Sequence, residues 1–363
     1  MRVVIAPDSF KGSINANDLA ESLAAGWATV RPQDELVLLP QADGGEGTLD
    51  AVASCHPNAT WHSVAGVSGP DGRKTTGRWL CLDDGTAVVE LAQMSGLPLM
   101  RRPDAGGAST TGLGQVIAAA LDAGAKSLIV GLGGSASTDG GAGALRALGA
   151  KLLDRDGRSI GVGGAALSRL DSIDIDKLRV PPLGGVELLT DTTAVLCGAS
   201  GAAHVFGPQK GASAGLRTRL DSALEQFATC LGSVVATTRI DEPGAGAAGG
   251  TGFGLSAWGG HLVPGADRIA DFTGLSNEFG RADVIVTGEG RFDATSMRGK
   301  LVGTVLQRSI ETATRTVVVA GQLAISPPGL GISLADLAGS AEAAIAHPSR
   351  WAYEAAAVAA ARI

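Results

Sequence analysis

Short apolar runs alternate with amphipathic segments toward both ends of the chain. Residues 3–6 (VVIA) contain no polar position, which predicts a strand that is buried on both faces. A segment from Asn15 or Asn17 to Val30 repeats apolar side chains at helical spacing and predicts a helix. Further short apolar runs predict four more strands, at residues 36–39, 284–286, 317–320 and 343–346. Strands separated by helices in this way are typical of a parallel, doubly wound sheet.

The middle of the chain has a different pattern, in which strands follow one another directly. Residues 61–67, 78–82 and 86–91 predict antiparallel strands, and Asp84-Gly85 predicts a hairpin turn between the last two. Beyond them, the pattern predicts helices at residues 112–123 and 142–148 and strands at residues 127–130 and 186–189.

The two patterns divide the chain into two domains, as its length of 363 residues suggests. We expect residues 1–65 and 281–363 to form one discontinuous α/β domain. Residues 66–280 are expected to form a mixed α/β domain inserted into the first. Hydrophobic residues make up 45% of the chain but aromatic residues only 4%, so the cores must consist mainly of Ala, Val, Leu and Ile.

Charge and cysteine usage exclude several classes of protein. The net charge is −7 and no basic block occurs, so we expect no nucleic-acid partner and no membrane partner. The four cysteines and five histidines are scattered without the spacing of a zinc site. No run of signal-peptide or transmembrane length is seen. We therefore expect a cytoplasmic protein that acts on small molecules.

Polar side chains gather where the predicted strands end. The first strand leads into Asp8, Ser9, Lys11 and Ser13. In a parallel sheet such groups face the ligand-binding crevice, and the N-terminus of the following helix favours an anion. Lys11 could hold a phosphate or a carboxylate as a point charge. The alternative is that Asp8 and Ser13 cap the helix and that Lys11 is solvated.

The second strand end carries Asp43 and Glu46 on either side of paired glycines. Two carboxylates in this position suit a metal-bound phosphate or the hydroxyls of a substrate. The alternative is a helix N-terminus whose acidic residues complement the helix dipole.

The third strand end is the glycine- and serine-rich segment of residues 131–141. Its glycines, Gly133 and Gly134 among them, let backbone amides approach an anion, and the hydroxyls of Ser135, Ser137 and Thr138 could donate to phosphate oxygens. Asp139 stands where the next helix begins. The alternative is an ordinary turn in which Asp139 caps that helix.

The fourth strand end carries Glu289, Arg291 and Asp293. Arg291 could contact a carboxylate or phosphate with two hydrogen bonds. Asp191, which follows the predicted strand at residues 186–189, could act as a general base, with a surface turn as the alternative. Lys210 lies in the turn of residues 206–211, which could present it to a ligand, although an ordinary surface turn is the favoured interpretation.

Together these groups suit phosphoryl transfer, which needs metal-binding carboxylates, an anion cradle, a cation and a base. The usual nucleotide motifs are absent. Gly299-Lys300 is followed by Leu301 and so does not complete a Walker motif, and no protein-kinase motif occurs.

In these motifs the sequence closely resembles the bacterial type I glycerate kinases, which phosphorylate D-glycerate with ATP. The matching stretches cover essentially the whole chain in the family's order and include IAPDSFKGS from residue 5, ADGGEGT from 42, ELAQMSGL from 90 and GAAHVFGPQKGA from 201. The resemblance implies a flavodoxin-like domain beside a restriction-endonuclease-like one, with the active site in the cleft between them. It also implies ATP and Mg²⁺ as cofactors. It favours transfer of the phosphoryl group to the 2-hydroxyl of glycerate, in the breakdown of organic acids. A homodimer is compatible with the resemblance but is not required by it.

The resemblance also suggests a role for each candidate residue. Asp191 would be the base, with Lys11 and Asp43 also catalytic. The loop after the first strand would grip the acid, while residues 131–141 take the nucleotide, and Glu289 and Asp293 would bind metal. The expected substrate-binding residues are Asp8, Ser9, Ser13, Glu46 and Arg291. The expected ATP-binding residues are Gly133, Gly134, Ser135, Ser137, Thr138 and Asp139.

The chain departs from the family pattern at three motif positions. Ala194-Val195 replaces a usual Asn-Pro pair near the expected base, Thr138 stands where Asn is common, and Thr295-Ser296 where Gln-Thr is common. A four-carbon sugar acid is therefore an alternative acceptor, and a non-catalytic ligand sensor is an alternative of another class. A third alternative is a small-molecule kinase with a G-L-x-S-S-A loop, which would not account for the other three strand ends.

Overall fold

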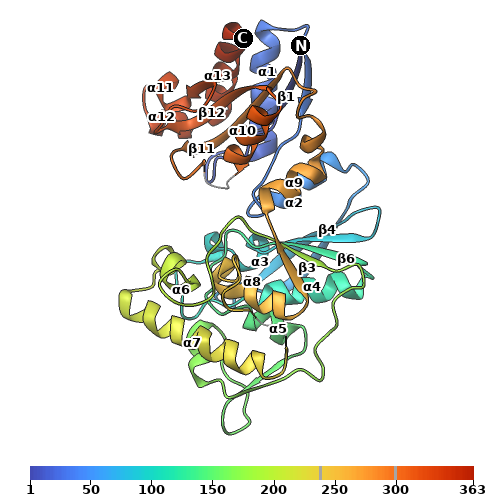
Figure 1. The fold of residues 1–363 in the computed structure, drawn as a ribbon, viewed down its shortest axis with the longest axis vertical. Coiled ribbons are helices and arrows are strands. Elements are labelled where there is room, and N and C mark those ends of the chain that lie inside the picture. Colours follow the sequence, from blue (N-terminus) through green and yellow to red (C-terminus); the bar gives the residue numbers. More distant parts are fainter. Residues whose placement is uncertain (237–238, 298–300) are drawn as a thin grey trace. The chain divides into compact units, whose positions relative to one another are not determined.

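The computed structural model describes residues 1–236, 239–297 and 301–363 (Figure 1). Gly299-Lys300 therefore lies outside the described residues. The chain forms two compact units. The first comprises Met1–Asp43, Asp50–Pro57 and Gly265–Ile363, and the second comprises Gly44–Leu49 and Asn58–Pro264.

The first unit contains a five-stranded sheet in which every pair of neighbouring strands is parallel. Its strands are β1 (Arg2–Ile5), β2 (Glu35–Leu38), β11 (Val284–Phe292), β12 (Arg315–Leu323) and β13 (Leu330–Ser333). Their order in the sheet is β13-β12-β11-β1-β2. The chain therefore leaves β1 on one side toward β2 and returns on its other side at β11, so the strand order reverses between β1 and β11.

Helices cover both faces of this sheet, which explains the unbroken apolar run in β1. Val3 and Ile5 belong to a core shared with α1 (Ala16–Val30) and α13 (Pro348–Arg362). Val4 and Ala6 face the opposite way and share a core with α9 (Gly265–Thr273) and α10 (Leu301–Glu311). Successive strand residues point to opposite faces, so a strand covered on both sides needs apolar residues at every position. This unit also contains α11 (Leu334–Ala338), α12 (Ala341–Ala346) and most of α2 (Thr48–Cys55), whose first two residues belong to the second unit.

The strand expected at residues 343–346 is wrong, because these residues lie in helix α12. Ser340 caps this helix, accepting a hydrogen bond of 3.1 Å from the Ala343 amide, and alanine has the highest helix propensity of all residues. The fifth strand is β13, which pairs with β12. A four-residue apolar run is compatible with either a strand or a helix, and here the cap and the alanines favour the helix.

The second unit contains a mixed six-stranded sheet in the order β10-β9-β6-β5-β4-β3. Strands β3 (Thr60–Ser68), β4 (Lys74–Cys81) and β5 (Thr86–Glu90) are antiparallel neighbours, so the predicted hairpin is confirmed. Strands β5, β6 (Ser127–Gly131), β9 (Val186–Leu189) and β10 (Gly260–Val263) are parallel. A two-stranded ribbon is formed by β7 (Lys151–Leu153) and β8 (Ser172–Asp174). The helices are α3 (Ala92–Ser95), α4 (Thr111–Asp122), α5 (Ala142–Ala147), α6 (Ala202–Phe206), α7 (Ala214–Gly232) and α8 (Ala247–Ala257).

The limits of the two units differ from the limits expected at residues 65 and 281. Residues 60–65 belong to the second unit because they pair with β4. Helix α9 belongs to the first unit because its Ala266 and Ala270 pack in the core beside Val4. Of the helices that the structure describes, none is long and apolar enough to cross a membrane.

Candidate active site

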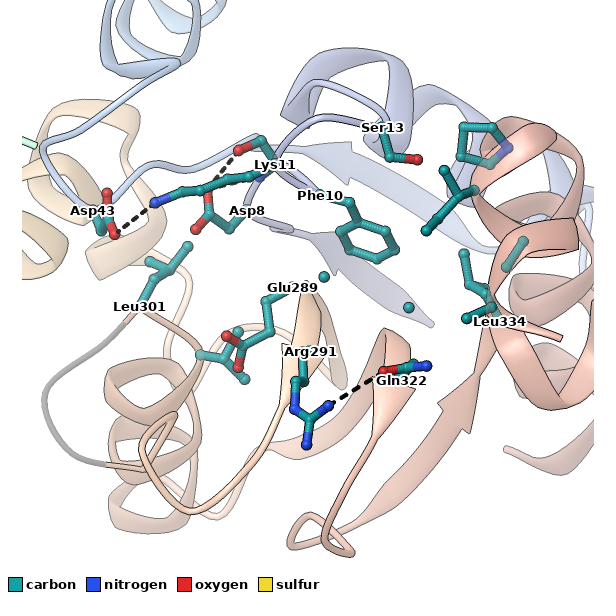
Figure 2. A pocket seen from close by; sticks show the side chains of 18 residues that line it. Asp8, Phe10, Lys11, Ser13, Asp43, Glu289, Arg291, Leu301, Gln322 and Leu334 are labelled. Atoms are coloured by element: carbon teal, nitrogen blue, oxygen red, sulfur yellow. Dashed lines mark hydrogen bonds and ion pairs between the residues drawn. The ribbon is translucent and has the colours of Figure 1, made fainter. Parts of the chain in front are cut away.

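A cavity of about 450 Å³ opens in the first unit where β1, β11 and β12 end (Figure 2). Ligands of doubly wound sheets bind outside the carboxyl ends of the strands, at the point where the strand order reverses. The cavity occupies this point, because β1 and β11 lie on either side of the reversal. It brings together seven of the residues expected at the site: Asp8, Ser9, Lys11, Ser13, Asp43, Glu289 and Arg291.

The loop after β1 is held in a defined shape that presents Lys11. The Asp8 amide donates to the Gly288 carbonyl over 2.9 Å, so the loop still follows β11 at this point. Phe10 then turns into the core, and its amide donates to the Ile14 carbonyl over 2.9 Å, which closes a tight turn. Gly12 has a φ of +77°, a conformation that glycine adopts without strain. The turn leaves the Lys11 side chain 56% exposed, with its Nζ atom 3.6 Å from Oδ2 of Asp43.

Asp8 is a carboxyl group of the cavity with a strongly perturbed pKa. Burial raises its pKa to about 7, and the neighbouring carboxylates of Asp43 and Glu289 act in the same direction. The Lys11 ammonium and the Ser9 amide, which donates to Asp8 over 2.7 Å, favour the charged form but do not compensate for the burial. Strongly perturbed carboxyl groups in a cavity are typical of functional sites.

Arg291 lines the cavity and is held at its rim. Its Nη1 atom donates to Oε1 of Gln322 over 3.4 Å, and its Nε atom lies 3.4 Å from Oδ2 of Asp293. Asp293 accepts hydrogen bonds from the Thr295 amide and hydroxyl over 2.8 and 2.7 Å, in a local turn.

Glu289 lines the cavity, whereas Asp293 does not. Within the described ranges, no group of three or more His, Cys, Asp or Glu residues has the arrangement of a metal site. The metal pair of Glu289 and Asp293 therefore stays a prediction.

The second and third predicted strand ends meet within the second unit. The Gly133 amide donates to the Gly44 carbonyl over 3.1 Å. A Cβ atom on Gly133 would lie 2.4 Å from Cα of Gly45, so the glycines allow two loops to pack backbone against backbone. Glu46 lies over this contact, since a Cβ on Gly134 would lie 3.0 Å from its Oε1 atom. These loops stand at the carboxyl end of β6.

The neighbouring parallel strands bring two more acidic residues to the same edge of this sheet. Glu90 ends β5 and is buried, and it accepts a hydrogen bond from the Leu49 amide over 3.1 Å. Asp191, the expected base, follows β9 and is half-buried. It belongs to the second unit, whereas Lys11 and Asp43 belong to the first. Glu90 was not singled out as a site residue, although it lies in the quoted ELAQMSGL stretch.

The serine-rich part of the third strand end is closed to solvent. Ser137, Thr138 and Asp139 are each 1% exposed or less. Asp139 accepts hydrogen bonds from the amide and the hydroxyl of Thr110, each over 2.9 Å, and from the Gly141 amide over 3.2 Å. This geometry favours the capping alternative for Asp139, and contacts of these three residues with ATP stay a prediction.

A surface turn was the favoured interpretation for Lys210, and it is wrong. Its side chain is 2% exposed, and its Nζ atom donates to the Ser137 carbonyl over 2.5 Å. Burial lowers the pKa of Lys210 to about 7, against the attraction of Asp139. The glycines and the proline around Lys210 are typical of an exposed turn, which is why it was expected at the surface. Its position inside the quoted GAAHVFGPQKGA stretch was the one signal in the sequence that could have identified it as a functional residue.

Comparison with known proteins decides the family. The model of the glycerate kinase family matches residues 3–362 of the chain. The chain belongs to the glycerate kinase family. The protein is therefore a kinase, the resemblance noted in its sequence is confirmed, and membership of a kinase family implies the use of ATP.

Individual members of the glycerate kinase family are similar over most of their length. Glycerate 2-kinase of Escherichia coli K12 is 40% identical over 307 residues, which cover 83% of this chain and 80% of that protein. Glycerate kinase of Bacillus subtilis 168 is 42% identical over 310 residues, which cover 83% of this chain and 79% of that protein. The crystal structure of a presumed glycerate kinase 2 from Salmonella typhimurium LT2 matches with a TM-score of 0.83 at 34% identity, covering 100% of this chain and 98% of that one.

Proposed function

We propose that this kinase transfers the γ-phosphoryl group of ATP to the 2-hydroxyl of D-glycerate, within the breakdown of organic acids. The observation that carries the proposal is the gathering of Lys11, Arg291 and the carboxylates of Asp8, Asp43 and Glu289 around one cavity. Phosphoryl transfer depends mainly on positioning and on stabilising negative charge, and these are the groups that it needs.

The charged residues have complementary parts in this reaction. Lys11 and Arg291 would stabilise the negative charge of the phosphates. Asp191 is the proposed base, which would accept the proton of the attacking hydroxyl. Asp43, through its contact with Lys11 at 3.6 Å, would hold the ammonium in place.

The cavity also suits Mg²⁺. This ion is usually held by one or two carboxylates together with phosphate oxygens, without an all-protein cage. Glu289 lines the cavity and would supply such a carboxylate. Asp293, the second candidate, is not part of the lining but lies beside Arg291, which is. When bound, Mg²⁺ would offset part of the charge of the triphosphate.

We further propose that the first unit is flavodoxin-like and that the second is restriction-endonuclease-like. Numbered along the chain within the first unit, its strands have the order 2-1-3-4-5, which is the flavodoxin-like order and supports the first assignment. The second assignment rests on the family resemblance alone.

The test is release of ADP by the purified protein with Mg-ATP and one acceptor at a time. D-glycerate should give release well above the reaction without acceptor, and the four-carbon acid erythronate should give less. A larger response to erythronate would replace the proposed substrate by the four-carbon acid. Release that is independent of every short hydroxy acid would refute the catalytic proposal and favour a ligand sensor.

A further inference from the structure

The cavity of the first unit has two chemically different ends. Figure 2 shows Asp8, Lys11, Asp43 and Glu289 together on one side, with Leu334 on the far side and the ring of Phe10 between them. Leu334 packs in one hydrophobic cluster with Ala344 of helix α12, and Ile345 of the same helix and Pro348 also line the cavity. Leu301 lies beside the charged group and Ser13 toward Leu334, but all the charged side chains named here lie away from Leu334, so the cavity favours a ligand with a charged end and an apolar end.

A three-carbon hydroxy acid does not meet this description. Glycerate carries a carboxylate or a hydroxyl on every carbon, so it has no apolar surface with which to cover Leu334 and Ile345. The volume of about 450 Å³ lies in the range of roughly 300–1,000 Å³ that is usual for pockets of larger ligands. A nucleotide joins a flat, largely apolar ring to a chain of phosphates, and it matches both ends.

The segment first expected to bind the nucleotide, residues 131–141, presents fewer polar side chains to a ligand. In this segment Ser137, Thr138 and Asp139 are buried, and the Asp139 carboxylate and the Ser137 hydroxyl make hydrogen bonds within the protein. Their hydroxyl and carboxylate groups are thus turned away from solvent. The position of the cavity points the same way, because nucleotides bind at the reversal of strand order in doubly wound sheets, an analogy drawn at the level of the fold.

We infer that the adenosine end of ATP binds at the apolar side of the first unit's cavity, against Leu334, Ala344 and Ile345, with its phosphates directed toward Lys11 and Arg291. This assignment reverses the division of labour expected from the sequence, in which the loop after the first strand grips the acid. It rests on the proposed function for the identity of the nucleotide, since a kinase of this family uses ATP.

The test is a matched pair of substitutions on helix α12. Ala341 lines the cavity, whereas Ala346 lies on the same helix, is exposed, and does not line it. Ala341→Phe would place a ring where the base should bind, and Ala346→Phe adds the same ring outside. We expect Ala341→Phe to weaken ADP binding at least tenfold by titration calorimetry, while binding of tripolyphosphate, which has no base, changes less than twofold. Ala346→Phe should leave both unchanged.

Two further variants cover the other outcomes. Ile345→Ala removes apolar contact from a side chain that is 61% exposed, so folding should be unaffected and ADP binding should weaken about threefold. Ser135→Ala, in the serine-rich loop, should leave ADP binding within twofold. Unchanged ADP binding in both Ala341→Phe and Ile345→Ala would overturn the inference. So would a stronger loss in Ser135→Ala than in Ala341→Phe.

Binding of ADP does not depend on the acceptor, so this inference and the proposed function fail separately. If ADP binding responds as expected but no hydroxy acid is phosphorylated, the adenosine site stands and the proposed reaction falls. If D-glycerate is phosphorylated but the α12 variants bind ADP normally, the reaction stands and the adenosine site falls.

Discussion

Replacement of Asp8 by Asn should make the protein more stable at neutral and alkaline pH, although Asp8 lies in the proposed active site. The substitution keeps the shape of the side chain and an oxygen that can accept from the Ser9 amide, but it removes the charge. Burial and the carboxylates of Asp43 and Glu289 raise the pKa of Asp8 from 3.8 to about 7. The folded protein therefore holds this group in its charged form only at a cost.

The size and the pH range of the effect follow from this pKa. Each pKa unit corresponds to about 1.4 kcal/mol, so the ionised carboxylate lowers the free energy of unfolding by up to about 4 kcal/mol. Between pH 3.8 and 7 the folded state binds more protons at Asp8 than the unfolded state does, so stability falls as the pH rises. Below pH 3.8 the group is neutral in both states and costs nothing; above pH 7 the full cost applies.

The assay is urea unfolding from pH 5 to pH 9, without nucleotide or metal. At pH 8 the Asp8→Asn protein should exceed the wild type by about 2–4 kcal/mol, and the difference should shrink toward pH 5. Asp156→Asn is the matched control. The Asp156 side chain is 59% exposed and lies 3.8 Å from Arg158, so its loss should change stability by less than about 1 kcal/mol. Equal stability of Asp8→Asn and wild type at pH 8, or a gain that grows toward pH 5, would refute the reasoning.

Two further predictions concern the second unit. The pKa of Lys210 is lowered from 10.5 to about 7, so the unfolded state binds more protons between these values and stability should rise with pH by up to about 1.4 kcal/mol per pH unit. Lys210→Met should remove this slope in urea unfolding from pH 7 to pH 10, and an unchanged slope would show that Lys210 is not its source. Asp191→Asn should lower kcat with D-glycerate at least about a hundredfold, the low end for loss of a general base. Activity within a few-fold of wild type would exclude Asp191 from that role.

The strands of the first unit could largely be predicted from the sequence because their signal is local. Residues 3–6 are apolar at every position, and the structure explains this by helices on both faces of β1. The hairpin between β4 and β5 was also predictable, because an Asp-Gly pair is typical of such a turn. In the structure Gly85 has the positive φ, +88°, that the turn requires. The polar residues after the first strand were likewise predictable as site residues, because they directly follow a buried run, and in the structure they line the cavity.

What the sequence could not settle depends on burial by distant parts of the chain. Asp139 has the same local sequence setting whether it caps a helix or contacts a phosphate. In the structure Thr110, from another segment, buries its carboxylate, which also accepts from the Gly141 and Gly143 amides at the start of α5, as a cap does. Lys210 follows a turn sequence typical of the surface, yet it is buried against Ser137. The run at residues 343–346 is too short to show a period, so only its cap and its packing make it a helix.

The most direct test of the central claim is the product formed from Mg-ATP and D-glycerate, followed by phosphorus NMR with the purified protein. We predict that 2-phosphoglycerate and ADP appear in equal amounts, the phosphoglycerate signal being split into a doublet by its single neighbouring proton. A triplet would indicate 3-phosphoglycerate and would place transfer at the other hydroxyl. Formation of ADP with inorganic phosphate alone, or no reaction, would contradict the claim that this kinase phosphorylates glycerate.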